Sequence, residues 1–252
     1  MTAELIAIVA LGAVIAGFVQ GLSGFAFGMV SMSIWAWTVE PRLAAVLAVF
    51  GALVGQIIAA VTVRRPFNRT VLWPFLLGGV LGVPLGVWLL PRFDVPLFQT
   101  CLGVLLAVWC PLMLLSDRLP PVRWGGRRAD AVIGGIGGVM GGIGGFAGVV
   151  PTLWCTLRRM QRDEQRAVIQ NFNLAMQVVA FTLHVGTGNV TWNMVPLLAM
   201  VAVAVLVPVL LGGKLYLGIS EQAFRKIVLG LLTASGIALL LASLPVLLKR
   251  LG

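Results

Sequence analysis

Two glycine-rich segments hold the residues best suited to binding a ligand. Residues 21–26 read GLSGFA and residues 142–147 read GIGGFA, and each segment interrupts a long apolar stretch. A helix interrupted inside lipid frees backbone N–H and C=O groups, which is tolerated only where protein or a watery cavity covers them. Interruptions at corresponding places in two halves of a chain point to the binding site of a transporter. The pattern therefore predicts a carrier of a small solute that binds at these breaks.

The chemistry expected at the breaks is anion binding. A helix that begins after a break presents unpaired N–H groups and about half a positive charge, which holds an anion without Lys or Arg. Glycine lets the backbone approach the anion closely and form a nest of N–H donors, and Ser23 adds a hydroxyl. Two facing helix ends would suit a small oxyanion. The expected contacts are Ser23, Gly24, Phe25, Gly144, Gly145 and Phe146.

Helix packing is the competing interpretation of glycines in this region. Gly134, Gly138 and Gly142 repeat every four residues, a spacing typical of close helix contacts, and packing is the expectation for these three. Phe25 and Phe146 are expected to pack or to gate rather than to bind, because the face of a phenyl ring repels anions.

Amide side chains form a second candidate set. An amide within a span is costly and usually faces the protein interior. Asn173 shares a helix face with Gln170 and with Gln177. Such amides either donate hydrogen bonds to an oxyanion or join neighbouring helices, and the sequence leaves both roles open. The set comprises Gln56, Gln170, Asn171, Asn173 and Gln177.

The composition is that of a membrane protein. The 252 residues are 60% hydrophobic and 10% charged, with a mean hydropathy of +1.04, whereas a soluble domain has roughly 25% charged residues. The chain is therefore expected to be an all-α polytopic membrane protein. The net charge of +10 arises from short basic loops between apolar segments, as the positive-inside rule expects, and does not indicate a nucleic-acid partner.

The distribution of reactive residues argues against an enzyme. Every Asp and Glu lies in a loop or at the end of an apolar run, and Cys101, Cys110 and Cys155 have no metal-type spacing. A membrane hydrolase would need convergent acid, base or metal groups inside the spans. We therefore expect no catalytic residues, no metal and no cofactor. His184 is expected to be structural, and the turn at 158–166 is expected to be solvated with internal ion pairs.

Ten apolar runs divide the chain into two repeats. They lie at about 4–20, 24–39, 43–63, 71–90, 96–115, 131–143, 145–157, 167–184, 193–213 and 226–248. An offset of 121 residues superposes Gly24 on Gly145 and Gln56 on Gln177, which predicts repeats at 1–115 and 131–252 joined by a cytoplasmic loop at 116–130. Each repeat has a glycine-broken helix pair and three spans, giving about eight to ten membrane segments. The pair at 4–39 is either two short spans or a re-entrant hairpin.

The basic loops orient these repeats. Placing them in the cytoplasm leaves both termini outside. The basic loop at 64–69 corresponds to a nearly neutral loop at 184–191, and the weakly charged turn at 40–42 corresponds to the basic turn at 158–166. Because the charge bias changes sides, the repeats are expected to be inverted, with a substrate site near the membrane midplane at their interface.

In these motifs the chain resembles the TauE/SafE family of sulfite exporters. The resemblance rests on residues 17–28 and their repeat at 138–151, on Arg166-Ala167, on Gly82-x-Pro84-x-Gly86, and on Phe224-Arg225 followed by Gly230. It implies transport of sulfite or of a small organosulfur anion such as a sulfonate, sulfoacetate or thiosulfate, without a cofactor, across a bacterial or archaeal plasma membrane. The chain departs from the family at 168–173, where VIQNFN replaces the small residues with Ser or Thr that the family often has.

The expected function is transport of this small anion by alternating access. Export is favoured, because an anion that leaves an inside-negative cell gains about 2.3 kcal/mol per charge per 100 mV. The alternatives are an anion channel, an uptake permease for a small carboxylate or sulfonate, and a subunit of a membrane enzyme. The expected partners are the anion and the lipid bilayer, with a homodimer left open.

Overall fold

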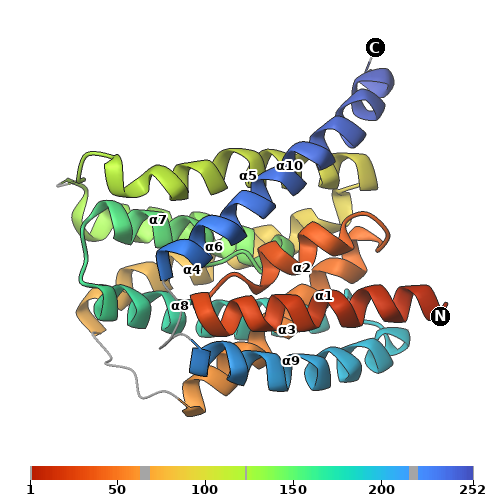
Figure 1. Cartoon of the computed structure of the whole chain (residues 1–252), viewed down its shortest axis with the longest axis horizontal. Coiled ribbons are helices and arrows are strands. Elements are labelled where there is room, and N and C mark those ends of the chain that lie inside the picture. Colours follow the sequence, from red (N-terminus) through yellow and green to blue (C-terminus); the bar gives the residue numbers. More distant parts are fainter. Residues whose placement is uncertain (1, 63–68, 123, 216–220, 252) are drawn as a thin grey trace.

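The fold is helical throughout the part of the chain that the computed structural model describes, residues 2–62, 69–122, 124–215 and 221–251 (Figure 1). Seven helices within these ranges are long and apolar enough to cross a membrane. The all-α polytopic fold expected from the composition is therefore confirmed. Arg64, Arg65 and Arg123, which contributed to the predicted orientation, lie outside the described residues.

The α-helices of the described ranges are α1 (Ala3–Ser23), α2 (Phe27–Trp35), α3 (Pro41–Thr62), α4 (Arg69–Leu89), α5 (Val95–Leu115), α6 (Gly126–Gly144), α7 (Val149–Leu157), α8 (Arg162–Gly186), α9 (Val195–Leu215) and α10 (Glu221–Leu251). Two of them begin at a side-chain cap. Thr2 Oγ1 accepts a hydrogen bond from Leu5 N at 3.4 Å, and Asp94 Oδ1 accepts one from Leu97 N at 3.0 Å. Each cap satisfies an N–H group that the first turn of a helix leaves free.

Each glycine-broken pair is a long helix followed by a half-length helix. The run at 4–20 extends to Ser23 as a 21-residue helix, whereas the run at 24–39 yields only the nine residues of α2. In the second half α6 has 19 residues and α7 has nine. At 1.5 Å per residue, α2 and α7 are each about 13 Å long, which is too short for a hydrocarbon core of about 30 Å. The alternative of two short spans for the pair at 4–39 is therefore wrong.

The half-helix α2 is mostly buried in protein, with only Ser33 and Ile34 half-buried. Phe27, Met32 and Trp35 are fully buried, and Trp35 Nε1 donates a hydrogen bond to Ile8 O of α1 at 3.2 Å. The apolar residues of this segment therefore contact neighbouring helices instead of lipid, which explains why an apolar run does not mark a span here.

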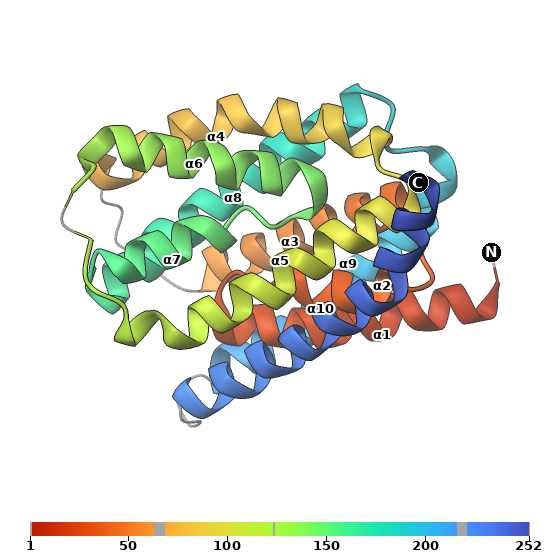
Figure 2. The same cartoon turned by 90° about the horizontal axis from the view of Figure 1, so that it is seen from above.

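Equivalent helices of each half pack on the other half. α1 packs along α9, as Figure 1 shows, and α4 packs along α6, as Figure 2 shows. Glycines allow the close approach, since a Cβ added at Gly21 would overlap the backbone of α9 and one at Gly82 would overlap the backbone of α6. Gly134, Gly138 and Gly142 lie against the backbone of α4, which confirms the prediction that they serve helix packing.

The facing residues also give the relative directions of these helices. The pairs are Gly78 with Ala131, Gly82 with Gly135, Gly86 with Val139, Gly17 with Val205 and Gly21 with Val209. The numbers rise together, so α4 is parallel to α6 and α1 is parallel to α9. α5 and α10 are antiparallel, because Thr100 Oγ1 lies 2.9 Å from Ser243 Oγ while Arg225 donates to Met113 O at the other end.

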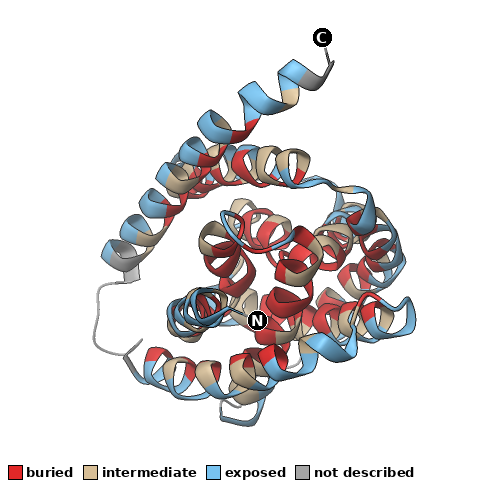
Figure 3. Ribbon diagram, turned by 90° about the vertical axis from the view of Figure 1, so that its right-hand side faces the viewer, coloured by how far each residue is buried: buried red, intermediate tan, exposed pale blue. Residues whose placement is uncertain are grey.

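Burial is concentrated where the two halves meet. Figure 3 shows buried residues facing the interior and exposed residues on the outer surface, with α10 extending beyond the other helices at its C-terminal end. Many exposed outer side chains are apolar, including Leu81, Val203 and Leu241. An apolar exterior is what a lipid environment requires.

Candidate functional site

Both breaks are built on a glycine in the left-handed conformation. Gly24 has a φ of +85° and Gly145 has a φ of +78°, a region in which a Cβ is strained. Each glycine ends the long helix with its N–H bonded to a carbonyl four residues earlier. Gly24 N lies 2.7 Å from Gln20 O, and Gly145 N lies 2.9 Å from Gly141 O. The prediction of two equivalent helix breaks is confirmed.

One glutamine braces each break. Gln56 Nε2 donates to Gly24 O at 2.6 Å, and Gln177 Nε2 donates to Gly145 O at 3.1 Å. The donors lie on α3 and α8, the helices that follow the two half-helices, so equivalent residues make equivalent bonds. A carbonyl released by a break at membrane depth needs such a partner. The Oε1 atoms of both glutamines are buried and have no hydrogen-bond partner.

The two breaks lie against each other. A Cβ added at Gly28, in the first turn of α2, would lie 2.7 Å from Gly145 O and 2.9 Å from Gly144 O. A Cβ at Gly145 would lie 3.3 Å from the Ala48 backbone of α3. Phe146 is buried. The second break is thus enclosed by helices of the first half.

The first break, by contrast, borders a cavity of about 380 Å³. Apolar side chains of α1, α2, α5 and α10 form one part of its lining, including Leu22, Met29 and Leu229. Among the described residues that line it, none is Asp or Glu. The polar lining comprises Ser23, Thr152, Thr156, Arg159, Arg162, Gln165, Arg166, Gln170 and Arg225.

The arginines make this cavity electropositive. Arg225 donates to Met113 O at 2.6 Å and to Ser116 Oγ at 2.8 Å, and Arg159 donates to Leu119 O at 3.0 Å. These acceptors are neutral oxygens, and they position the two guanidinium groups at the cavity. Arginine is well suited to binding planar or tetrahedral oxyanions because its donors form a rigid fork.

Gln170 and Ser23 offer hydrogen-bonding groups beside the break. Gln170 is 5% exposed and lines the cavity, and its amide makes no hydrogen bond within the described part of the chain. A Cβ added at Gly24 would lie 2.7 Å from Gln170 Nε2. Ser23 Oγ accepts bonds from Phe25 N at 3.4 Å and Ala26 N at 3.2 Å, which leaves its hydroxyl hydrogen unused. Because the Gln170 amide lines the cavity, a ligand or water in the cavity can serve as its partner.

The predicted residues separate into a group at the cavity and a group away from it. Ser23, Phe25 and Gln170 line the cavity, and Gly24 adjoins Gln170. Asn171 is half-buried on a neighbouring face of α8. The remaining predicted residues are buried outside the cavity lining, and they are Gln56, Gly144, Gly145, Phe146, Asn173 and Gln177.

Sequence reasoning missed the arginines of this cavity. The turn at 158–166 was expected to be solvated, and Arg159 and Arg162 are exposed, but the expectation did not include the cavity that Arg159, Arg162 and Arg166 line. The spacing of polar residues could have indicated that these arginines share a surface with Gln170, because one face of α8 carries a polar residue every three or four positions. These residues are Arg162, Arg166, Gln170, Asn173 and Gln177.

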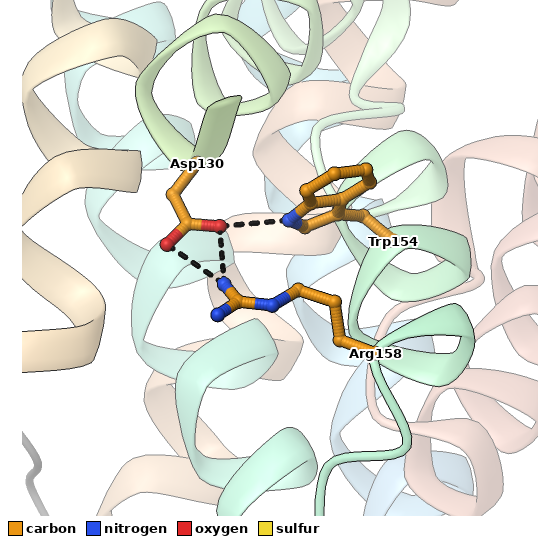
Figure 4. A network of polar contacts seen from close by, with 3 residues as sticks. All are labelled: Asp130, Trp154 and Arg158. Atoms are coloured by element: carbon orange, nitrogen blue, oxygen red, sulfur yellow. Dashed lines mark hydrogen bonds and ion pairs between the residues drawn. The ribbon is translucent and has the colours of Figure 1, made fainter. Parts of the chain in front are cut away.

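Arg158 has a separate, structural role. Its Nη1 lies 2.7 Å from Asp130 Oδ1, and Trp154 Nε1 donates to the same oxygen at 2.7 Å (Figure 4). Asp130 belongs to the start of α6, so the network holds the end of α7 against α6.

His184 also has a structural role, because both of its ring nitrogens have partners within the protein. Asn189 Nδ2 lies 3.1 Å from His184 Nδ1, and Gly142 O lies 2.9 Å from His184 Nε2.

Comparison with known proteins gives one family. The family model described as Sulfite exporter TauE/SafE matches residues 9–239. No curated protein and no solved structure gives a significant match.

Proposed function

The chain belongs to the sulfite exporter TauE/SafE family of membrane transporters, and on that premise we propose that it moves a small sulfur-containing oxyanion through the cavity beside the first break. Sulfite and small sulfonates are the substrates proposed. The observation that supports this site is the joint presence of four arginines, an unpartnered Gln170 and no carboxylate in one lining. The guanidinium groups would attract the negatively charged substrate, and its oxygens would accept hydrogen bonds from Gln170 and Ser23.

The proposed mechanism is alternating access. The first break borders the cavity whereas the second is enclosed. This difference is expected of a carrier in a conformation that is open to one side of the membrane only. An open channel would require a continuous aqueous path past both breaks, so their unequal access favours a carrier.

Two inverted repeats, 1–115 and 131–252 joined by 116–130, would supply the second state. Equivalent glutamine bonds at Gly24 and Gly145 support this proposal. The parallel pairs α1–α9 and α4–α6 support it as well, because each joins the first helix of one half to the fourth helix of the other. Exchanging the conformations of the halves would close the first break and open the second.

Export is the proposed direction. The predicted orientation places Arg159, Arg162 and Arg166 on the cytoplasmic side, where they would recruit anions from inside the cell. Efflux of a dianion down an inside-negative potential gains about 4.6 kcal/mol per 100 mV, twice the value for a single charge. No coupling ion is then needed. Efflux that is insensitive to collapse of the membrane potential would contradict this direction.

The test uses the purified chain in liposomes loaded with sulfite. Wild-type efflux should saturate with sulfite concentration, and both Gln170→Ala and Arg166→Gln should slow it by about tenfold or more, because each removes a charge-assisted hydrogen bond worth about 1.5–3 kcal/mol. Arg127→Gln is the matched control, since Arg127 is an exposed arginine outside this cavity. Equal effects of Arg166→Gln and Arg127→Gln, or efflux that does not saturate, would refute the site.

A further inference from the structure

The polar face of α8 continues beyond the cavity to Asn173, whose surroundings are unusual. Asn173 is 2% exposed and is not part of the cavity lining. Both Nδ2 and Oδ1 are buried without a hydrogen-bond partner. A native fold rarely leaves both ends of an amide unsatisfied, and such a group calls for an explanation by a ligand, by water or by another conformation.

The position of Asn173 relates it to both breaks. Gln170 lies one turn earlier on α8 and adjoins Gly24 of the first break, and Gln177 lies one turn later and is bonded to Gly145 of the second. At 3.6 residues per turn these three side chains fall within about 60° of each other around the helix. They therefore form a line that leads from the open break to the enclosed break.

The start of α7 completes the surroundings of Asn173. A Cβ added at Gly148, the N-cap of α7, would lie 2.6 Å from Asn173 Nδ2 and 2.8 Å from Oδ1. Val149 N donates to Phe146 O at 3.0 Å and Pro151 has no N–H, which leaves the N–H groups of Gly148 and Val150. These N–H groups and the partial positive charge of a helix N-terminus favour an anion. The unpartnered amide thus occupies the space that a side chain at position 148 would take, directly beside the helix N-terminus.

We propose that Asn173 and the N-terminus of α7 form a second, occluded station for the transported anion, reached from the cavity when α7 moves relative to α8. The inference rests on the proposed function, because it concerns the same substrate. In the structure the anion would bind first at Gln170, and Asn173 Nδ2 would become its donor as it passes toward the second break. Asn173 would then determine which anions cross, whereas the cavity would determine which anions enter.

The decisive variant is Asn173→Leu, in which a side chain of similar branching removes both unpartnered atoms. Because no internal hydrogen bond is lost, the unfolding temperature should stay unchanged or rise by about 2–4 °C. Sulfite efflux from preloaded liposomes should fall by about tenfold or more. Sulfite should still protect the variant against thermal unfolding as it protects the wild type, because the cavity is intact. Asn171→Leu is the matched control and should retain efflux, since Asn171 lies about 160° away from Asn173 around α8.

The outcomes separate the station from the proposed function. Wild-type efflux together with normal efflux in Asn173→Leu would overturn the station alone. Unfolding temperatures lowered in both Asn173→Leu and Asn173→Ala would assign the amide a structural role and would also overturn the station. If leucine is too large to accommodate, Asn173→Ala gives the same test with a smaller side chain, and normal efflux in that variant overturns the station. A wild-type chain that moves neither sulfite nor small sulfonates would refute the proposed function and the station together.

Discussion

Replacing Gly28 with alanine tests the contact between the two breaks. The added Cβ would lie 2.7 Å from Gly145 O, against 3.4 Å or more for an ordinary contact, so the first turn of α2 and the second break would have to separate by about 0.7 Å. Overpacking of this kind costs about 1–3 kcal/mol, and the higher helix propensity of alanine returns at most about 1 kcal/mol. Gly28→Ala should therefore lose up to about 3 kcal/mol of stability and most of its sulfite efflux.

Gly135→Ala is the matched control for this substitution. Gly135 lies within α6, and the nearest atom to its added Cβ is 3.5 Å away, which is an ordinary contact. This variant gains helix propensity without overlap and should be as stable as the wild type or up to about 1 kcal/mol more stable. The assay is the unfolding midpoint in detergent, followed by efflux from liposomes. If the two variants unfold at the same midpoint and transport equally, the two breaks are not in contact and the geometry described above is wrong.

Two further substitutions test the second break and its support. Gly145→Val places a β-branched side chain at a φ of +78°, which costs about 1–2 kcal/mol in backbone strain alone. We expect normal insertion into the membrane fraction but sulfite efflux below about a tenth of wild type, and normal efflux would count against a role for this turn in transport. Arg158→Ala leaves the buried Asp130 without its cation; breaking a buried pair costs about 3–5 kcal/mol, and the 32% exposure of the Arg158 side chain places the expected loss at the lower end. Asp130→Asn can keep the hydrogen bond from Trp154 and should unfold at a higher midpoint than Arg158→Ala; the reverse order would show that the carboxylate charge, not its pairing, supports α7.

The breaks themselves could be predicted from the sequence because their chemistry is local. A glycine that ends a helix at positive φ is required by the backbone, and the two segments repeat at a constant offset. The same offset related Gln56 to Gln177, and the structure gives both the same bond to a break carbonyl. Local rules therefore identified these positions without knowledge of the tertiary structure.

The half-helices and the cavity could not be predicted because they depend on distant segments. Hydropathy does not distinguish an apolar residue that faces lipid from one that faces protein. The 16-residue apolar run at 24–39 therefore resembled a membrane span, although Phe27 and Trp35 of α2 are fully buried in protein. The arginines after α7 were expected only to be solvated, because no neighbouring residue in the sequence indicates a cavity beside them. Leu229 and other apolar residues of α10, more than 60 positions away, complete the cavity around them.

The buried amides show how the two halves differ while keeping a polar residue near each break. The offset of 121 pairs Gln20 with Gly141 and Ala52 with Asn173. In the first half the amide is on α1, where Gln20 Nε2 donates to Ala52 O at 2.9 Å while its Oε1 has no partner. In the second half the amide is on α8, and neither of its polar atoms is bonded. Simple packing would favour apolar side chains at both places, because an unsatisfied amide costs about 1–3 kcal/mol. The bonded amide lies in the half whose break borders the cavity, and the unbonded amide lies in the half whose break is enclosed. The difference in amide hydrogen bonding between the halves therefore parallels the difference in cavity access between the two breaks. This parallel is expected if the amides change partners when the cavity opens to the other break.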